Sequence, residues 1–342
     1  MRRLTLLAAA AIAIGLAVPA SAASPTEVGV VQNFGPPLAA SCHNPEGIAI
    51  DPTGNLYAGS FAFQPVANIC VVNRDGVLVD VIPVPAGSAG VASLLGELFE
   101  PGQGLYVLDF ANGAPGNGRL LLVNPGTHAV SVVATGFQAP NALTQDRHRS
   151  LYISDSFQGV IWKVAPDGTT TVWKQDLRLT PQPGAGPPFG ANGVAFDRNQ
   201  RFLYVSTTAD GKIYRIRVMD DGSAGDLQLF ASGEAIDAAQ GTTEALHGAD
   251  GIMFDVQGNL YVAANSAQHP APGLPGELQV LSPEGRLIAR YDGVGQHDLD
   301  FPASLVFHER AVYMTNLSLT DGGANSKLSV MAVPFPGEPL RP

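Results

Sequence analysis

The sequence predicts an all-β fold, a six-bladed β-propeller, in a single domain over residues 27–337. Three observations predict it. The chain contains six related units, helical hydrophobic periodicity is nearly absent, and 39 Gly with 27 Pro give the turn density of an all-β chain. With 45% hydrophobic and only 14% charged residues, the chain is globular rather than disordered.

Segment 1–22 predicts a secretory signal peptide. It begins with Arg2 and Arg3, continues as an apolar run and ends in the small-residue stretch Ala20-Ser21-Ala22, so we expect cleavage near Ala22. An uncleaved anchor is the alternative, but the run is shorter than the ~20 residues that span a bilayer. We therefore expect a secreted or periplasmic protein with no membrane span in the mature chain.

The net charge indicates which classes of partner to expect, and the two cysteines indicate the redox state of the compartment. The formal net charge of −11 would become −13 without Arg2 and Arg3, and no basic patch stands out to displace counterions from nucleic acid. We expect a small-molecule substrate, no nucleic acid, and a monomer. Cys42 and Cys70 predict a disulfide in an exported protein, the alternative being two free thiols.

The six units share a local pattern of a short strand, an Asp-x-x-Gly-like turn and a second strand containing Leu-Tyr-Val or a variant. Most add a third and a fourth strand, as in GVIWKVAPDGTTTVWK, and four short strands with tight turns form a propeller blade. Four clear copies begin at Asn44, Pro140, Ala191 and Ala249, and two weaker copies lie near Ala89 and from Pro302.

The two ends of the repeat array complement each other. The last unit ends after its third strand, KLSVMAVPF, and the strand EVGVVQNF stands unpaired before the first unit. The N-terminal strand is therefore predicted to complete the last blade, which removes two exposed strand edges.

Equivalent positions on the first strands of the blades form a ring around the central channel. Five residues before the turn aspartates of the clear copies stand Glu46, Asn141, Asn192 and Asp250, whereas the weaker copies offer Ala89 and Ala303. Small residues follow, which lets the backbones approach closely near the axis: Gly47, Ala142, Gly193 and Gly251.

Two carboxylates and two carboxamides that converge in a dry channel would repel each other and lack partners. A hard cation resolves this, and oxygen-only ligands favour Ca²⁺, with Mg²⁺ or Mn²⁺ as alternatives. The competing interpretation is that Glu46, Asn141, Asn192 and Asp250 bond to the preceding loops around a water-filled channel.

The repeats resemble the regucalcin/gluconolactonase (SGL) family of six-bladed propellers, with paraoxonase and diisopropylfluorophosphatase as structural cousins. The segments that carry the resemblance include PEGIAID, PNALTQD, NGVAFD and DGIMFD, and the likeness extends over about 44–335. It implies a catalytic calcium held by Glu46, Asn141, Asn192 and Asp250. SAGVASLLGE replaces the substrate-contacting segment of the sugar lactonases, and no paraoxonase-like histidine dyad is present.

A calcium ion with open positions suits hydrolysis of a lactone or an ester. Asp250 would be both ligand and reacting group, as nucleophile or as base. His43 and His247 each lie three residues before a proposed ligand, so either could shuttle protons or be an ordinary loop residue.

Loops at the same end of the channel carry aromatic residues. A phenylalanine-rich rim would suit an apolar lactone or aryl ester, although such rings also fill gaps between blades. Two strand-end aspartates could contact substrate or cap turns. The candidate substrate-binding residues are Phe61, Phe110, Asp109, Asp155, Phe157, Phe189 and Phe301, with Phe63 in the same loops.

Three other functions fit a propeller of this kind, because a fold does not determine a function. The first is a non-catalytic NHL-like propeller that binds a partner or a glycan and uses the metal structurally. The second is a strictosidine-synthase-like propeller without metal. The third is a quinone-dependent dehydrogenase, for which no basic cluster is evident.

Overall fold

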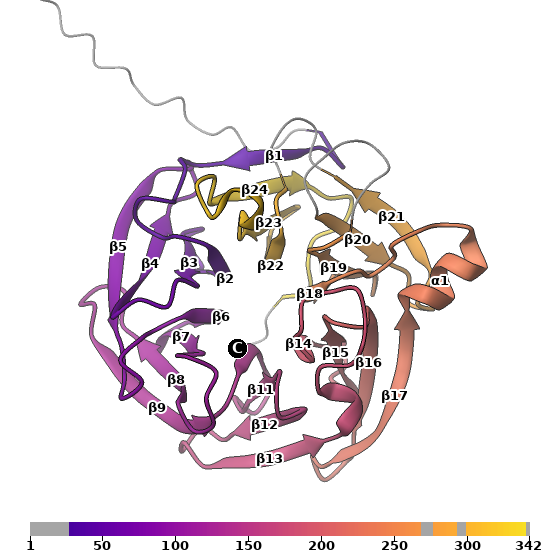
Figure 1. The fold of residues 1–342 in the computed structure, drawn as a ribbon, viewed down its shortest axis with the longest axis horizontal. Helices are drawn as coiled ribbons and strands as arrows, with labels where there is room; N and C mark the ends of the chain where they lie inside the picture. The colour runs from indigo at the N-terminus through magenta and orange to yellow at the C-terminus, as the bar shows by residue number, and fades with distance from the viewer. Residues whose placement is uncertain (1–26, 268–275, 293–298, 340–342) are drawn as a thin grey trace, which may run out of the picture.

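The six sequence repeats form six antiparallel sheets of four strands, and the N-terminal strand supplies the fourth strand of the last sheet (Figure 1). The structure, a computed structural model, describes residues 27–267, 276–292 and 299–339. The predicted signal peptide and its cleavage site lie outside the described residues. The six-bladed propeller predicted from the sequence is confirmed.

The first three blades contain the strands β2 to β13. Blade 1 comprises β2 (Pro45–Ile50), β3 (Leu56–Ser60), β4 (Val66–Val72) and β5 (Leu78–Pro85). Blade 2 comprises β6 (Leu94–Glu100), β7 (Gly104–Asp109), β8 (Gly118–Val123) and β9 (Val130–Phe137). Blade 3 comprises β10 (Pro140–Gln145), β11 (Leu151–Asp155), β12 (Val160–Val164) and β13 (Thr170–Gln175).

The other three blades contain the remaining strands. Blade 4 comprises β14 (Ala191–Phe196), β15 (Phe202–Thr207), β16 (Lys212–Val218) and β17 (Ala224–Ser232). Blade 5 comprises β18 (Ala249–Phe254), β19 (Leu260–Ala264), β20 (Glu277–Leu281) and β21 (Leu287–Tyr291). Blade 6 comprises β22 (Pro302–His308), β23 (Ala311–Asn316), β24 (Lys327–Ala332) and β1 (Val31–Phe34).

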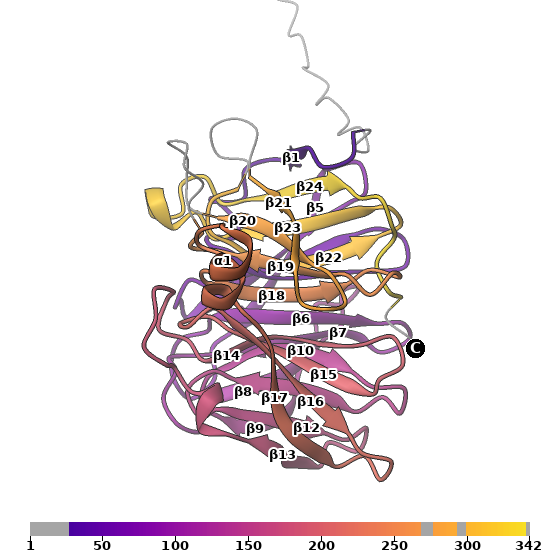
Figure 2. The ribbon, with the colours of Figure 1, turned by 90° about the vertical axis from the view of Figure 1, so that its right-hand side faces the viewer.

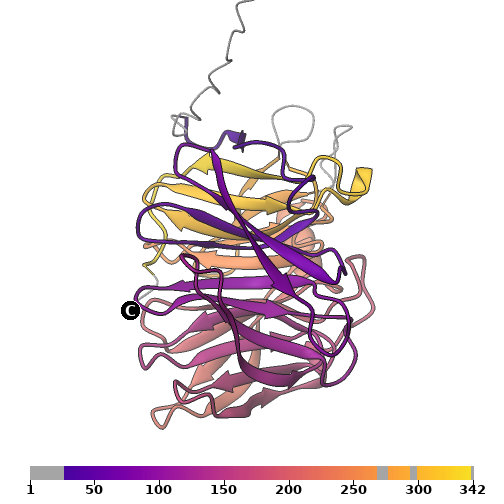
Figure 3. The ribbon, with the colours of Figure 1, turned by 90° about the vertical axis from the view of Figure 1, so that its left-hand side faces the viewer.

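The ring closes through the N-terminal strand, as the sequence predicts. β1 pairs antiparallel with β24, with Val31 opposite Met331, so the first strand of the chain is the outer strand of blade 6. The innermost strands β2, β6, β10, β14, β18 and β22 contact one another in order around the channel (Figure 1). Figure 2 and Figure 3 show the propeller from two opposite sides, with the strands of its sheets seen edge-on.

Helical structure is confined to the connections among the described residues. The helix α1 (Gly233–Gln240) joins β17 to β18 at the outside of the ring (Figures 1 and 2). Two single 3-10 turns, η1 (Leu177–Leu179) and η2 (Leu319–Asp321), precede β14 and β24. In the part of the chain that the structure describes, no helix is long and apolar enough to cross a membrane.

The tyrosine of the Leu-Tyr-Val pattern holds neighbouring blades together. Tyr57 stacks on Phe99 of the next blade at 5.6 Å between ring centroids. The same contact, from the second strand of one blade to the first strand of the next, recurs as Tyr152–Phe196, Tyr204–Phe254 and Tyr261–Phe307 at 4.9 to 5.0 Å. Such aromatic pairs add to the hydrophobic burial between blades.

A disulfide joins Cys42 to Cys70 and so ties the segment before β2 to β4. The bridge closes a loop with a sequence separation of 28 residues. This is the disulfide alternative of the sequence prediction. Bridges of this kind persist in oxidising compartments.

The C-terminal tail crosses one end of the channel, which we call the lower end. The amide of Glu338 donates to the Phe254 carbonyl at 2.9 Å, and the amide of Val256 donates to the Pro336 carbonyl at 3.0 Å. Glu338 and Pro339 line the channel there, together with the lower halves of the innermost strands, around a cavity of about 120 Å³. The first residues of the innermost strands mark the opposite, upper end.

Candidate functional site

A β-bulge occurs at the same place in the innermost strand of every blade. In blade 1 the pairing shifts between Pro45 and Ile48, so that Glu46 and Gly47 together face the single residue Gly59. A bulge of this kind re-aims a side chain, and bulges are common beside active sites. The equivalent residues, which we call the ring residues, are Glu46, Leu95, Asn141, Asn192, Asp250 and Ala303.

The ring residue of blade 2 differs from the sequence prediction. Ala89 lies in the segment between β5 and β6, and Leu95 occupies the bulge. Blade 2 has no turn aspartate; its turn follows Glu100, whose carbonyl accepts from the amide of Gln103. Counting back five residues from Glu100, instead of from an aspartate, gives Leu95.

The residue after each ring residue is small because the neighbouring blade leaves it no room. A Cβ at Gly47 would lie 2.1 Å from the Leu95 carbonyl oxygen, and a Cβ at Gly193 would lie 2.3 Å from that of Asp250. Both distances are far inside van der Waals contact. The glycines predicted to allow close backbone approach are therefore required by the packing of one blade's bulge on the next.

The four polar ring residues are buried, and three of them present an oxygen atom without a hydrogen-bond partner. Their exposed fractions are 5% for Glu46, 3% for Asn141, 3% for Asn192 and 4% for Asp250. Glu46 Oε2, Asn141 Oδ1 and Asp250 Oδ1 accept no hydrogen bond. Since a buried polar atom without a partner is costly, these three oxygen atoms are suited to bind a positively charged group.

Both ring carboxylates have raised pKa values, and the charge of Asp250 contributes to the shift of Glu46. The pKa of Glu46 is raised well above its usual value, first by burial and then by the charges of Asp250 and Glu97. Burial raises the pKa of Asp250 to about 8, although hydrogen bonds from Asn265, Asn192 and the Gly251 amide oppose the shift. Residues from blades 1 and 5 thus share one electrostatic site.

The ring residues fit a hard divalent cation. Asp250 Oδ1 has no partner, whereas Oδ2 is held by Asn265 Nδ2 at 2.9 Å. The side-chain amide groups of Asn141 and Asn192 donate to hydroxyls, and the Asn141 oxygen has no hydrogen-bond partner. Among the described residues no three His, Cys, Asp or Glu side chains gather as a metal site. The ring instead combines two carboxylates with two carboxamides, a donor set that suits Ca²⁺.

Glu97 is a buried carboxylate that the sequence reasoning missed. Its carboxyl fills space left by glycines of blade 1: a Cβ at Gly59 would lie 2.5 Å from Glu97 Oε1. Neither Glu97 oxygen has a hydrogen-bond partner, and burial raises the pKa of this side chain. The equivalent residues of the other blades are apolar: Ile48, Leu143, Val194, Ile252 and Leu305. A charged residue within LLGELFE was the available signal.

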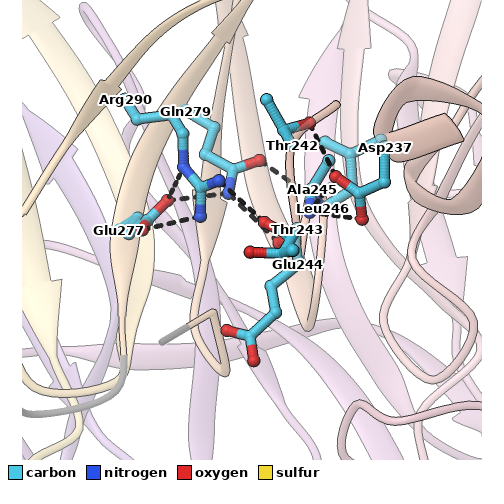
Figure 4. Close-up of polar contacts among 9 residues, drawn as sticks. All are labelled: Asp237, Thr242, Thr243, Glu244, Ala245, Leu246, Glu277, Gln279 and Arg290. Atoms are coloured by element: carbon cyan, nitrogen blue, oxygen red, sulfur yellow. Dashed lines mark hydrogen bonds and ion pairs between the residues drawn. The ribbon is translucent and has the colours of Figure 1, made fainter. Parts of the chain in front are cut away.

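A polar network fixes the segment that leads into Asp250 (Figure 4). Arg290 binds Glu277 with two hydrogen bonds of 2.7 and 2.8 Å and donates to the Thr243 carbonyl at 2.7 Å. Gln279 Oε1 accepts from the Leu246 amide at 2.8 Å. On the other side Asp237 accepts from the Ala245 amide (Figure 4).

The same segment is held in an unfavourable backbone conformation. Glu244 and Leu246 have φ values of 60° and 58°, which residues other than glycine adopt at a cost of about 1 kcal/mol or more each. The surrounding hydrogen bonds offset this cost. Backbone strain of this kind clusters beside functional sites.

Among the described residues, no hydrogen bond or ion pair joins either candidate histidine to Asp250. His247 lines a separate hollow of about 290 Å³ with Asp210, Glu234 and Asp237. His43 is exposed, and its ring lies against Gly323. A role in proton transfer therefore stays a prediction for both.

Five phenylalanines form one cluster at the upper end: Phe61, Phe63, Phe110, Phe157 and Phe189. Phe110 is central, with centroid distances of 5.7 Å to Phe61 and 5.8 Å to Phe157. Phe110 also packs with the ring residue Leu95, so the cluster reaches the ring itself. Phe63 is 44% exposed, which leaves part of the cluster open to a ligand. Phe301, also proposed for the rim, has no ring contact with this cluster among the described residues.

The two strand-end aspartates carry structural hydrogen bonds. Asp109 is fully buried, accepts from the Ser93 and Ala111 amides, and pairs with Arg119 at 2.5 Å. Asp155 is also fully buried and accepts from the Gln138 and Ala139 amides. These contacts fit the turn-capping alternative rather than substrate binding.

Comparison with known families adds to this geometry. Residues 187–316 match the family model of the SMP-30/Gluconolactonase/LRE-like region. The chain contains an SMP-30/gluconolactonase/LRE-like region. The resemblance predicted from the sequence is confirmed over this region, which includes the ring residues Asn192, Asp250 and Ala303. No curated protein sequence matches the chain.

Solved structures share the fold. A gluconolactonase from Xanthomonas campestris is 17% identical with a TM-score of 0.62, over 94% of this chain and 99% of that chain. A calcium-binding protein, regucalcin from Agrobacterium tumefaciens, is 14% identical with a TM-score of 0.61, over 90% and 95%. A luciferin-regenerating enzyme is 13% identical with a TM-score of 0.62, over 90% and 97%. At these identities the likeness shows the six-bladed propeller alone, while the SMP-30/gluconolactonase-like region suggests a lactonase-type hydrolase.

Proposed function

We propose that the protein is a calcium-dependent hydrolase that acts on a small, apolar lactone or ester at the upper end of the channel. The observation that carries the proposal is the set of buried oxygen atoms without partners on Glu46, Asn141 and Asp250, which come from three different blades. The chemistry of the matched family region, and a propeller neighbour described as calcium-binding, are consistent with it.

Glu46, Asn141, Asn192 and Asp250 would hold the cation. When bound, calcium would polarise the substrate's carbonyl oxygen and lower the pKa of a nearby water. Asp250 is the reacting carboxylate: Asn265 fixes its Oδ2 and leaves Oδ1 facing the site. Burial of the ring excludes bulk water, which strengthens the electrostatic interactions among these groups.

The phenylalanine cluster sets the proposed substrate class. Leu95 replaces a polar ring residue in blade 2 and packs with the buried Phe110, so an apolar cluster extends from the ring to Phe63, whose exposed side chain forms its surface. An alkyl or aryl group next to the scissile carbonyl would lie on this surface. A sugar lactone, which carries a hydroxyl on most carbons, would leave those hydroxyls without partners there.

We also propose that the protein is exported and acts as a monomer on a small molecule. The arginine-led apolar run of segment 1–22 and the Cys42–Cys70 disulfide support an oxidising compartment.

The proposal predicts hydrolysis that depends on calcium and favours apolar substrates. Chelator-stripped protein would be assayed with phenyl acetate, an alkyl-substituted δ-lactone and gluconolactone, before and after calcium is restored. We expect turnover of the first two substrates, loss of at least about 100-fold on stripping, and recovery with calcium. Activity that is unaffected by the chelator would contradict the mechanism. Stoichiometric calcium binding without turnover would favour the non-catalytic binding module.

A further inference from the structure

Two buried hydroxyls lie behind the carboxamides of the ring. Ser156 directly follows β11 and Thr208 directly follows β15, which are equivalent positions in blades 3 and 4. Ser156 Oγ accepts from Asn141 Nδ2 at 3.1 Å, and Thr208 Oγ1 accepts from Asn192 Nδ2 at 2.9 Å. The two side chains have exposed fractions of 0% and 1%.

Each hydroxyl also donates its only hydrogen to the next blade. Ser156 donates to the Ala191 carbonyl at 2.6 Å, and Thr208 donates to the Ala249 carbonyl at 3.0 Å. A hydroxyl has one hydrogen, so each oxygen is left purely an acceptor toward the carboxamide. Only the NH₂ group of Asn141 or Asn192 can therefore face it, and the carboxamide oxygen is turned the other way.

In blade 5 the roles are reversed: the ring residue accepts the hydrogen bond and the residue behind it donates. Its ring residue Asp250 is a carboxylate, which needs a donor rather than an acceptor. The position equivalent to Ser156 and Thr208 is Asn265, whose Nδ2 donates to Asp250 Oδ2 at 2.9 Å. In blade 2 the apolar ring residue Leu95 is matched by Phe110 at that position. In blades 2 to 5 the residue type behind the ring thus follows the residue type in the ring, whereas in blade 1 Phe61 occupies this position behind Glu46.

We propose, building on the proposed metal centre, that Ser156 and Thr208 are positioning residues which turn the carboxamide oxygens of Asn141 and Asn192 toward the cation. Each also links one ring residue to the backbone that precedes the next, since Ala191 adjoins Asn192 and Ala249 adjoins Asp250. The cation site is thereby assembled through contacts between blades 3, 4 and 5.

The chain contains matched controls two residues earlier on the same strands. Ser154 Oγ donates to the Asn192 carbonyl and Ser206 Oγ donates to the Asp250 carbonyl, each at 2.6 Å. Both serines are fully buried and form the same kind of inter-blade bond to the backbone. Within the described residues, neither Ser154 nor Ser206 forms a hydrogen bond with the side-chain amide of a ring residue. Removing them tests the loss of an inter-blade bond without the loss of the acceptor behind the amide.

The experiment measures calcium affinity by calorimetry, and thermal unfolding of the stripped protein, for wild type and six variants. The test variants are Ser156→Ala and Thr208→Val, the rescue variants are Ser156→Thr and Thr208→Ser, and the controls are Ser154→Ala and Ser206→Ala. We expect a 10- to 100-fold loss of affinity for the test variants, as is typical when a group that orients a metal ligand is removed. The rescue variants and the controls should stay within about 3-fold of wild type, although the controls lower thermal stability.

Unchanged affinity in Thr208→Val and Ser156→Ala, in a wild-type background that binds calcium, would overturn this inference alone. An equal loss in Ser154→Ala and Ser206→Ala would reduce the two hydroxyls to ordinary inter-blade bonds and would overturn it as well. A wild-type protein that binds no calcium would overturn the proposed metal centre together with this inference.

Discussion

Asp250→Asn is expected to lower kcat/KM for ester or lactone hydrolysis by roughly 10³-fold, while the propeller stays folded. The substitution preserves the size of the side chain but removes the charge. Asn265 Nδ2 holds one oxygen of Asp250, so the new carboxamide would keep its oxygen toward Asn265 and turn its NH₂ toward the cation. The site would lose both a ligand and the reacting carboxylate.

Asp255→Asn is the matched control for this variant. Asp255 follows the other end of the same strand and caps the turn to β19 by accepting from the Gln257 and Asn259 amides. Its loss is expected to lower the melting temperature and to leave kcat/KM of the folded protein within about 3-fold of wild type. Retention of more than a tenth of the activity by Asp250→Asn would exclude Asp250 as the reacting group.

The metal-free protein is expected to lose stability as the pH rises from about 5 to 8. Burial raises the pKa of Asp250 from 3.8 to about 8 and raises those of Glu46 and Glu97 well above 4.5. In this range the folded protein keeps protons that the unfolded chain has released. The free energy of unfolding therefore falls with increasing pH, and Asp250 alone contributes on the order of 4 kcal/mol to that fall.

Calcium should reverse this behaviour, because it favours the ionised ring carboxylates. The melting temperature of chelator-stripped protein would be measured from pH 5 to 8, with and without added calcium. Carboxylates with lowered pKa values, such as Asp51, titrate below this window and do not interfere. Glu97→Leu, which installs the residue type of the sister blades, is expected to flatten the slope. A stripped protein whose melting temperature is constant or rises with pH would contradict the electrostatic description of the site.

The fold and the ring were accessible from the sequence because they depend on local repeats. The Asp-x-x-Gly-like turn and the Leu-Tyr-Val-like strand mark the hairpins of the four clear copies, and the tyrosine is the residue that packs on the next blade. Counting back from the turn fixed Glu46, Asn141, Asn192 and Asp250 in one register. The same count failed in blade 2 because Glu100 replaces the turn aspartate there.

The groups around the ring were not accessible because their contacts join different strands and are not visible in the local sequence. Glu97 lies within an apolar strand, and only the glycines of blade 1 show that its carboxyl has room. Ser156 and Thr208 are ordinary strand-end residues in the sequence, and their meaning depends on which amide lies beside them. His247 lies three residues before the ring residue Asp250 in the sequence, yet its side chain lines a separate hollow with Asp210 and Asp237.

Among the described residues, the phenylalanines proposed for the rim divide into a group in mutual contact and Phe301, which has no ring contact with that group. The loop positions of Phe61, Phe110 and Phe157 predicted a common location, and the structure brings them into contact. Phe301 has a comparable loop position, but its carbonyl accepts from the Leu317 amide and its φ is 52°. Sequence position alone did not separate these two cases.

We propose that side-chain oxygens from four blades hold one hard cation at the upper end of the channel. The most direct measurement is an anomalous difference map from crystals of the protein grown with calcium. One peak at about 2.3–2.6 Å from side-chain oxygens of Glu46, Asn141, Asn192 and Asp250 is the expected result. A map with no peak between these four side chains, or with the cation bound only elsewhere, would contradict the account.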